Sequence, residues 1–447
     1  MKIRDALSFF NIVKDDDREV KEIYDDSRLV TKNSIFIAIS KGNDYIEDAI
    51  TNGAIIVISD DSKSKYYVSK LKEKLLPFCL FFYGHIENKI KLIGVTGTNG
   101  KSTSAYLIHS MLKSSLLITT TSGIKNSFIS KNTTPYPLEF IKALKKAVKK
   151  KYKYLVMEIS SIGISEGRLN GLNFEKILLT NITSDHLDYH KNLNEYQNTK
   201  VNYLLKSDSF IYLPVECFVR FPLLRKVDRF ELYSEKEVEI ISENEVGILF
   251  LYKHNLFKTN LIGVLNIKNI VGVLTMLSSL CSLHRLKRKL RKILPLKGRM
   301  NVVNRNPLVI IDYAHTVIAL ESLLKDAINF NRKKIIVVFG AGGNRDFSKR
   351  REYGKIVENY GDIGIVTSDN PRDEDADKII DEIIGDSGFY FIRCPDRSKA
   401  IRQAFKYASK DDCILIVGKG AEVVQIVKGK NNHFSDFEEV RKCLKKH

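Results

Sequence analysis

A glycine-rich turn in which a lysine is followed by two hydroxyl side chains lies near residue 100. In KLIGVTGTNGKSTSAYLIHSMLKSS it separates an apolar run from an amphipathic helical pattern. Glycines let backbone amides close around phosphate, and the N-terminus of the following helix adds positive potential. Lys101 can reach the outer phosphates, and the hydroxyl of Ser102 or Thr103 can bind Mg²⁺. A chance glycine-rich turn is the alternative, because GTNGKST is shorter than GxxxxGK[ST], but the order of strand, loop, lysine and helix favours a nucleotide-binding loop.

A second polar stretch, VTSDNPRDED (366–375), places an arginine directly after a proline and among four acidic side chains. A turn that ends a strand and caps the next helix accounts for Pro371 and the acids. It does not account for Arg372. Open parallel sheets bind ligands outside the carboxyl ends of their strands, so a cation in this loop predicts a site for a negatively charged group.

Apolar runs alternate with helical patterns through most of the chain, and these elements must position the two loops. The runs are KLIGVT, LLITTT, KYLVMEIS and KILLTNI in the central part and LVIIDYAH, KIIVVFGAG, DIGIVTSDN and CILIVGKG in the last third. They are typical of strands buried on both faces of parallel sheets. We predict an α/β protein with parallel, doubly wound sheets and domain boundaries near residues 88 and 297. Residues 205–260 are irregular and indicate no clear element.

Length and composition indicate an ordinary globular protein. A chain of 447 residues suggests about three domains. It shows neither an apolar run long enough to cross a membrane nor a signal peptide, and its six scattered cysteines lack metal-ligand spacing, so we expect reduced thiols and a cytoplasmic location. The net charge of +19 is compatible with nucleic acid, an anionic substrate or a lysine-rich composition, but no nucleic-acid recognition motif accompanies it.

The chain resembles the Mur ligase family from about residue 24 to its end. TGTNGKST resembles the family's ATP loop, and further motifs follow in the family's order: NTTP, MEISS, LTNITSDHLDYH, YQNTK, GRM, DYAHT, GAGGNRD, DNPR and GKGAE. The resemblance implies an N-terminal domain for a UDP-sugar (1–88), a central P-loop ATPase (89–297) and a C-terminal Rossmann-like domain for an amino acid (298–447).

Motif order and spacing match the branch that adds meso-2,6-diaminopimelate to a UDP-N-acetylmuramoyl dipeptide in peptidoglycan synthesis. The resemblance therefore implies an ATP-dependent ligase that uses Mg²⁺ and passes through an acyl phosphate. We expect a monomer that binds neither nucleic acid nor membrane.

The resemblance also assigns site residues. The implied catalytic residues are Lys101, Glu158, His186 and Lys200, the last as an N6-carboxylysine; Ser102, Glu158, His186 and Lys200 are the implied metal ligands. The implied ATP-binding residues are Gly97, Thr98, Asn99, Gly100, Lys101, Ser102, Thr103, Asn266, Arg299, Asp312 and His315. The implied residues for the UDP-sugar peptide are Ser27, Thr133, Thr134, Ser160, Glu166 and Arg168. Those for diaminopimelate are Arg345, Asp369, Asn370, Pro371, Arg372, Gly418 and Glu422.

Three positions and one segment depart from the family pattern. Ile162 and Ala421 stand where the family usually has histidine, and Glu166 stands where it typically has glutamine. The stretch IFIAISKGNDYIEDAI is shorter than the family's uridine-binding loop. Because this stretch is shorter, the resemblance assigns only Ser27, of the retained DSR triplet (26–28), to that part of the substrate site.

Three alternative functions remain. The ligase could use L-lysine or another diamino acid, it could resemble folylpolyglutamate synthetase, or the chain could be a nucleic-acid-stimulated ATPase. NTTP, MEISS and DNPR argue against the second alternative. Arg372 favours diaminopimelate over lysine, because only diaminopimelate has a distal carboxylate with which an arginine fork can pair.

Overall fold

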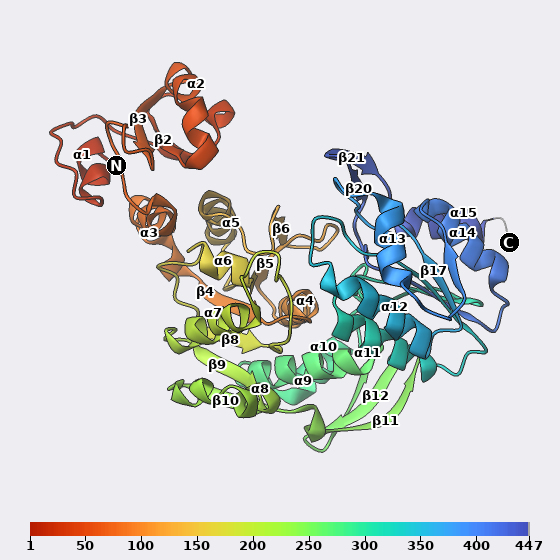
Figure 1. Ribbon diagram of the computed structural model, residues 1–447. Helices are drawn as coiled ribbons and strands as arrows, with labels where there is room; N and C mark the ends of the chain where they lie inside the picture. Colours follow the sequence, from red (N-terminus) through yellow and green to blue (C-terminus); the bar gives the residue numbers. More distant parts are fainter. Residues whose placement is uncertain (446–447) are drawn as a thin grey trace.

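The computed structural model describes residues 1–445; the last two residues of the predicted C-terminal domain, 446–447, lie outside the described part. Its N-terminal unit contains a small parallel sheet in the order β1-β2-β3, formed by Glu22–Tyr24, Ser34–Ala38 and Ala54–Ser59. Helices α1 (Ile3–Ser8) and α2 (Ile46–Thr51) accompany it. Figure 1 shows this unit at one end of the molecule, with α3 (Leu71–Phe82) between it and the central sheet.

The central sheet has seven parallel strands in the order β10-β9-β8-β4-β7-β5-β6. In chain order its strands are β4 (Lys91–Thr96), β5 (Ser115–Thr119), β6 (Ser127–Ile129), β7 (Tyr154–Ile159), β8 (Lys176–Leu179), β9 (Phe210–Pro214) and β10 (Phe230–Tyr233). Its helices are α4 (Lys101–Met111), α5 (Pro137–Lys149), α6 (Ser161–Ser165), α7 (Leu193–Leu205), α8 (Val215–Arg220), α9 (Val264–Ser278) and α10 (Leu283–Leu290). β7 and β8 are buried throughout and β4 is buried apart from Lys91, because separate apolar clusters cover the two faces of the sheet.

Residues 205–260, from which we expected no clear element, contain β9, β10 and a three-stranded antiparallel sheet. That sheet consists of β11 (Val238–Asn244), β12 (Gly247–Tyr252) and β13 (Asn255–Thr259). The sequence pattern indicates this sheet only weakly, because β11 is largely exposed and lacks a continuous apolar run. In addition, the turn between β12 and β13 is Lys253-His254, with both residues at positive φ, instead of the usual Asn-Gly pair.

The C-terminal sheet has six strands in the order β14-β15-β19-β16-β17-β18, of which only β14 is antiparallel to its neighbour. The strands are β14 (Asn301–Arg305), β15 (Leu308–Asp312), β16 (Ile335–Phe339), β17 (Ile363–Val366), β18 (Phe391–Arg393) and β19 (Cys413–Val417). The helices are α11 (Val317–Ile328), α12 (Ser348–Tyr360), α13 (Ala376–Ile384), α14 (Arg397–Tyr407) and α15 (Asp436–Leu444). Apolar clusters lie on both faces, so the predicted α/β class and doubly wound sheet are confirmed.

The strands of this sheet end earlier than the apolar runs suggested, and this places polar residues in loops. The run LVIIDYAH ends as a strand at Asp312, and DIGIVTSDN ends at Val366. Asp375 caps α13 by accepting a hydrogen bond from the backbone N–H of Asp377, as the turn interpretation of this stretch requires. After β19, strands β20 (Val424–Val427) and β21 (Lys430–His433) form a hairpin. Val427 of this hairpin forms a bridge with Arg372 in the loop after β17.

Across residues 1–445 the helices are too short or too polar to cross a membrane.

Candidate active site

The glycine-rich loop follows β4 and ends where α4 begins at Lys101. Gly97 and Gly100 have positive φ, of 140° and 82°. A Cβ on Gly97 would lie 2.0 Å from Oγ1 of Thr180, and one on Gly100 would lie 2.2 Å from Oδ1 of Asn269. Glycine is therefore required at both positions, and the loop backbone is held against two neighbouring segments.

A lysine and a carboxylate meet behind this loop. Nζ of Lys101 donates to the carbonyl oxygens of Gly97 and Thr98, at 3.0 and 2.6 Å, and Oγ of Ser102 donates to Glu158 at 3.1 Å. Burial raises the pKa of Glu158, while Lys101 and Ser102 oppose that rise. Burial lowers the pKa of Lys101, and Glu158 opposes that fall. The positive charge of Lys101 and the negative charge of Glu158 are thus each the main factor that offsets the burial of the other.

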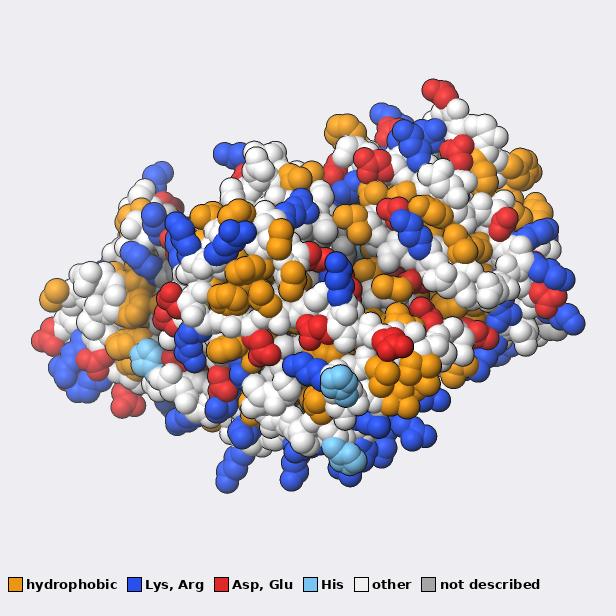
Figure 2. Space-filling view, turned by 90° about the horizontal axis from the view of Figure 1, so that it is seen from below, with side chains coloured by type: hydrophobic (Ala, Val, Ile, Leu, Met, Phe, Trp, Pro, Cys, Tyr) orange, Lys and Arg blue, Asp and Glu red, His pale blue; other side chains and the backbone are white. Residues whose placement is uncertain are grey.

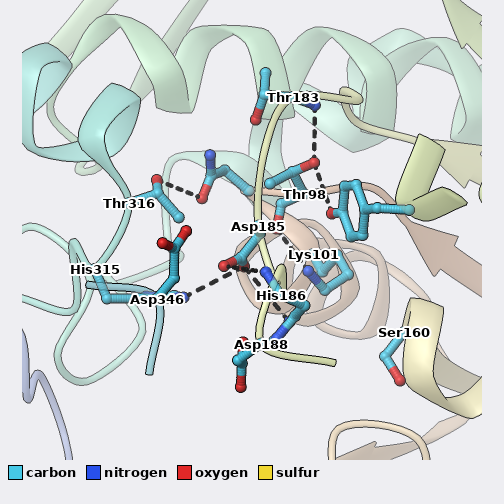
Figure 3. A network of polar contacts seen from close by, with 12 residues as sticks. Thr98, Lys101, Ser160, Thr183, Asp185, His186, Asp188, His315, Thr316 and Asp346 are labelled. Carbon is cyan, nitrogen blue, oxygen red and sulfur yellow. Dashed lines mark hydrogen bonds and ion pairs between the residues drawn. The ribbon is translucent and has the colours of Figure 1, made fainter. Parts of the chain in front are cut away.

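The loop after β8 carries a buried carboxylate between two histidines. Figure 3 shows Asp185 between His186 and His315, whose Nε2 atoms lie 3.5 and 3.6 Å from it. Lys349 of α12 lies 3.4 Å from the same carboxylate. Burial opposes ionisation of Asp185, but hydrogen bonding and charge from His315, with His186 and Lys349, hold its pKa well below the usual range. His315 lies in the loop after β15, and Lys349 lies on α12. The cluster therefore connects the C-terminal sheet and its helices to the central sheet.

His186, predicted in a loop after β8, lies there with a positive φ of 52°. Burial, together with the neighbouring Lys101, lowers its pKa to about 4, although Asp185 opposes the fall. The ring is therefore neutral at physiological pH, which is the form that binds metals.

Lys200 on α7 is almost completely buried, with 1% of its surface exposed. Its Nζ donates to the carbonyl oxygen of Gly97 at 3.0 Å. Burial, reinforced by Lys101, lowers its pKa well below the usual value for lysine. The site therefore favours a neutral amine at this position.

A cavity opens between the phosphate loop and the C-terminal sheet. It contains the predicted nucleotide residues Asn266, Arg299, Asp312 and His315. Sequence reasoning missed several of its other residues, among them Asn181, Asp185, Asn269, Tyr313 and Asp326. Asn269 could have been predicted from the sequence, because it lies one helical turn after Asn266 and therefore on the same face of the helix.

The NTTP loop is tied to the end of β7. Oγ1 of Thr134 accepts from the backbone N–H of Ser160 at 2.8 Å, and Arg168 donates to the carbonyl oxygen of Thr134 at 2.7 Å. Arg168 also donates to Glu166 at 2.7 Å and lies 3.9 Å from the Tyr136 ring centroid. Arg168 thus has protein partners on several sides and positions this loop.

Two predicted residues of the sugar-peptide set, Thr133 and Ser160, line the cavity, whereas Ser27 does not. Ser27 is buried in the N-terminal unit, where its carbonyl oxygen accepts from Nδ2 of Asn52 at 3.0 Å. The structure therefore does not bring Ser27 to the residues around the phosphate loop.

Two arginines flank Gly342 in the loop after β16. A Cβ on Gly342 would lie 2.9 Å from Nη1 of Arg372 and 3.5 Å from Cγ of Arg345. Arg372, at a positive φ of 52°, donates to the carbonyl oxygen of Gly343 at 2.6 Å, and Arg345 pairs with Asp188 of the central domain. Burial and the neighbouring Arg345 both lower the pKa of Arg372. The acidic side chains nearby therefore only partly offset the cost of holding a positive charge at Arg372.

Acidic and amide groups lie on the two adjacent loops. Asn370 donates to Glu422 at 3.1 Å, and Lys419, which sequence reasoning missed, donates to both of them at 3.1 Å. Gly418 has a φ of 110°, and a Cβ there would lie 2.5 Å from Oδ2 of Asp369. Burial raises the pKa of Asp369, and Lys419 opposes the rise. The loops after β16, β17 and β19 therefore meet in one charged cluster, to which the buried Pro371 also belongs.

The donor set suits Mg²⁺ better than a metal held by protein alone. Among the described residues, no three His, Cys, Asp or Glu side chains form a group that could hold a metal. Mg²⁺ typically takes one or two carboxylates or hydroxyls and completes its shell with water and substrate phosphates. Ser102 with Glu158, beside the phosphate loop, provides such a partial set.

None of the three side chains that depart from the family pattern, Ile162, Glu166 and Ala421, lines the cavity. Ile162 lies half-buried on α6, and the backbone nitrogen of Ala421 packs against Gly298, where a Cβ would approach it to 2.2 Å.

Two family models match the chain. The Mur ligase middle domain matches residues 95–277, and the Mur ligase, glutamate ligase domain matches residues 298–420.

Individual relatives match over nearly the full length. The chain is 33% identical to the UDP-N-acetylmuramoyl-L-alanyl-D-glutamate–2,6-diaminopimelate ligase of Clostridium botulinum, over 98% of this chain and 97% of that relative. A solved structure of a ligase of that name has a TM-score of 0.66 and 26% identity, covering 100% of this chain and 99% of the other. The MurF ligase of Thermotoga maritima in complex with ADP has a TM-score of 0.70 at 18% identity, covering 96% and 97%, and shares the fold.

Proposed function

Because the chain belongs to the Mur ligase family, we propose that it uses ATP to add meso-2,6-diaminopimelate to UDP-N-acetylmuramoyl-L-alanyl-D-glutamate. The observation that carries this function is the presence of two sites at carboxyl ends of strands, one in the central sheet and one in the C-terminal sheet, linked by the Arg345–Asp188 pair. One is the phosphate loop with Lys101, and the other is the charged cluster around Arg345 and Arg372. The full-length relatives named for this reaction support the same assignment.

In the first step, an oxygen of the D-glutamate γ-carboxylate attacks the γ-phosphorus of ATP. The bond between that phosphorus and the β,γ-bridging oxygen breaks, which gives an acyl phosphate and ADP. Two anions approach each other in this step, so catalysis depends on positive charge placed beforehand. Lys101 supplies such a charge at the N-terminus of α4, where the helix also attracts phosphate.

In the second step, the free amine of diaminopimelate attacks the acyl carbon. The new C–N bond forms, the C–O bond to phosphate breaks, and inorganic phosphate leaves; the amine nitrogen gives up one proton, which the departing phosphate can accept. Water must be kept from the acyl phosphate, because hydrolysis would waste the ATP. The contacts of Asp185 with His315 and Lys349 hold the two sheets together around this point.

We assign Mg²⁺ to two positions. Ser102 and Glu158 would hold one ion, and His186 and Lys200 the other, with Lys200 as a carbamate formed by its neutral amine and CO₂. The bound ions would neutralise phosphate charge. As an ammonium Lys200 could not bind a metal, whereas a carbamate presents anionic oxygens to it.

Specificity for diaminopimelate rests on Arg345 and Arg372. A guanidinium binds a carboxylate through two parallel hydrogen bonds, and the acids Asp369 and Glu422 are available for ammonium groups. L-Lysine lacks the distal carboxylate and would leave the partly buried Arg372 without an anionic partner, at roughly 1.5–3 kcal/mol for each charged hydrogen bond lost.

The proposal includes three domains, 1–88, 89–297 and 298–447, in a cytoplasmic monomer. The N-terminal domain, which contains Ser27, would bind the UDP part of the substrate. On the face in Figure 2 the Lys and Arg side chains are spread along the molecule, with acids among many of them, so this face does not favour a nucleic-acid ATPase.

Phosphate release from ATP, measured with each substrate omitted in turn, tests the proposal, with product mass as a second readout. We expect release to require both the muramoyl dipeptide and the diamino acid, and the product to contain one added diaminopimelate. The Lys101→Ala variant serves as the inactive control. Release driven by DNA alone, or release without a ligated product, would refute the assignment.

A further inference from the structure

The N-terminal end of α9 has no cap of its own, and two carboxylates from other elements replace it. The N-cap residue is Gly263, which has no side chain and a φ of 90°. Its backbone N–H donates to Glu243 of β11 at 2.9 Å, and that of Val264 donates to Oδ1 of Asp326 at 3.1 Å. Asp326 lies on α11, so a helix of the C-terminal sheet completes a helix of the central domain; Figure 1 shows α11 beside α9.

Asp326 differs from Glu243 in what it faces. Asp326 lines the cavity that begins at the phosphate loop, whereas Glu243 does not. Oδ1 of Asp326 accepts the hydrogen bond from the backbone N–H of Val264. Oδ2 has no hydrogen-bond donor among the described residues and packs against Cα of Gly263, where an added Cβ would approach it to 2.5 Å. One oxygen of this carboxylate is therefore left for a donor that the protein does not supply.

Asp326 contacts the N-terminal end of α9. This end lies as far from the phosphate loop as the nucleoside of a bound nucleotide would. Asn269 contacts Gly100 of the phosphate loop, and Gly263 precedes it by six residues on the same helix. At 1.5 Å per residue these positions lie roughly 9 Å apart along the axis. This is comparable with the reach from the phosphates to the base of an extended nucleotide.

The protein groups around Asp326 do not fully compensate the charge of its carboxylate. Burial raises its pKa to about 7; Glu243 and Asp312 add to the rise, and the Val264 N–H opposes it. A ligand that brought a hydrogen-bond donor to Oδ2 would relieve this cost.

We propose that Asp326 is a nucleoside-binding residue, whose Oδ1 positions α9 and whose Oδ2 accepts a hydrogen bond from a ribose hydroxyl or from the adenine amino group. The inference rests on the proposed ATP-dependent function and adds a nucleoside contact that no motif of the chain indicates. Asp326 is the only carboxylate of the described residues that both caps α9 and lines this cavity.

Asp326→Asn and Glu243→Ala separate the two roles of Asp326. In Asp326→Asn the amide oxygen must face the Val264 N–H, so the cap is kept and an N–H donor replaces the acceptor that faces the cavity. Glu243→Ala removes a cap at the same helix end and leaves the cavity lining intact. Isothermal titration with Mg·ADP measures affinity, and thermal unfolding shows that each variant is folded.

We expect Asp326→Asn to weaken ADP binding by about tenfold or more, and Glu243→Ala by less than about threefold. The parent should also bind either IDP or a 2′- or 3′-deoxy ADP more weakly than ADP, and Asp326→Asn should lose that discrimination. Equal weakening in both variants would reduce Asp326 to a helix cap and overturn the proposal. So would unchanged affinity in Asp326→Asn, which leaves the ligase assignment standing. A folded parent that binds no nucleotide would overturn both.

Discussion

Several charged side chains at the site are buried with fewer partners than their charge requires. Lys101 and Glu158 compensate each other, and Asp185 is held by two histidines and a lysine. Lys200 donates to a carbonyl oxygen and lies over the Tyr196 ring, where Lys101 disfavours its charge and Asp185 only partly offsets this. Such groups are costly to bury. We infer that bound substrates, metal and modification supply the missing partners.

Replacing Lys200 with alanine tests the carbamate. We expect Lys200→Ala to lose nearly all ligase activity and to remain folded, because the variant lacks the anionic oxygens proposed for the metal. A short carboxylic acid such as acetate should restore part of the rate by occupying the vacated space. The readout is product formation with and without added acid. Full activity without acid would exclude the carbamate role.

The raised pKa of Asp326 predicts a pH-dependent stability. Its pKa rises from 3.8 to about 7 on folding, so the native state holds a proton that the unfolded state releases between these values. The stability that this proton contributes is complete below about pH 4 and is lost as pH rises through 7. Asp326→Asn has no such dependence.

Calorimetric unfolding of both proteins between pH 5 and 8 checks this expectation. The Tm of the Asn variant minus that of the parent should increase from pH 5 to 7 and level off above 7. Parallel Tm profiles would show that Asp326 titrates normally.

At the scale of elements, sequence patterns located the strands of the two large sheets but not the contacts between elements. KYLVMEIS predicted β7 and CILIVGKG predicted β19, because a strand covered on both faces needs a continuous apolar run. The β11–β13 sheet was missed, since its exposed strand and unusual turn carry no such pattern. Asp326 and Lys419 were missed because their importance depends on which helix or loop packs against them.

A buried ion pair stabilises the C-terminal sheet next to the charged cluster. Arg397 of α14 donates to both oxygens of Asp436 at 2.8 and 2.9 Å, and also to the carbonyl oxygen of Val417 just before Gly418. Both side chains are fully buried. Removing one partner of such a pair typically costs about 3–5 kcal/mol.

Asp436→Ala should therefore lower the urea midpoint of the C-terminal unit and speed hydrogen exchange around Val417. Lys399→Ala, which removes one partner of an exposed pair on the same helix, should change stability by less than about 1 kcal/mol. Similar midpoints for the two variants would contradict this assignment of the buried pair.

At the scale of the whole molecule, the nucleotide cavity is formed jointly by the central and C-terminal sheets. Asn99 of the phosphate loop lies 3.4 Å from Thr316 at the start of α11, and Asp188 pairs with Arg345 across the same junction. The N-terminal sheet β1–β3 contributes no residue to the cavity.

Nucleotide binding should consequently protect both sides of this junction. We expect Mg·ADP to slow hydrogen exchange in residues 97–103 and 312–316 together, and to leave residues 22–59 unchanged. Hydrogen-exchange mass spectrometry measures all three segments in one experiment. Protection confined to the phosphate loop would show that the C-terminal domain does not contribute to nucleotide binding.

The central claim is that this ligase selects meso-diaminopimelate by its distal carboxylate, and the most direct measurement is kcat/KM for meso-diaminopimelate and for L-lysine in the parent and in Arg372→Ala. The account predicts a strong preference for diaminopimelate in the parent. Each charged hydrogen bond lost should cost roughly tenfold or more, so in the variant the preference should collapse through weaker use of diaminopimelate. Equal use of the two amino acids by the parent, or unchanged selectivity in Arg372→Ala, would contradict it.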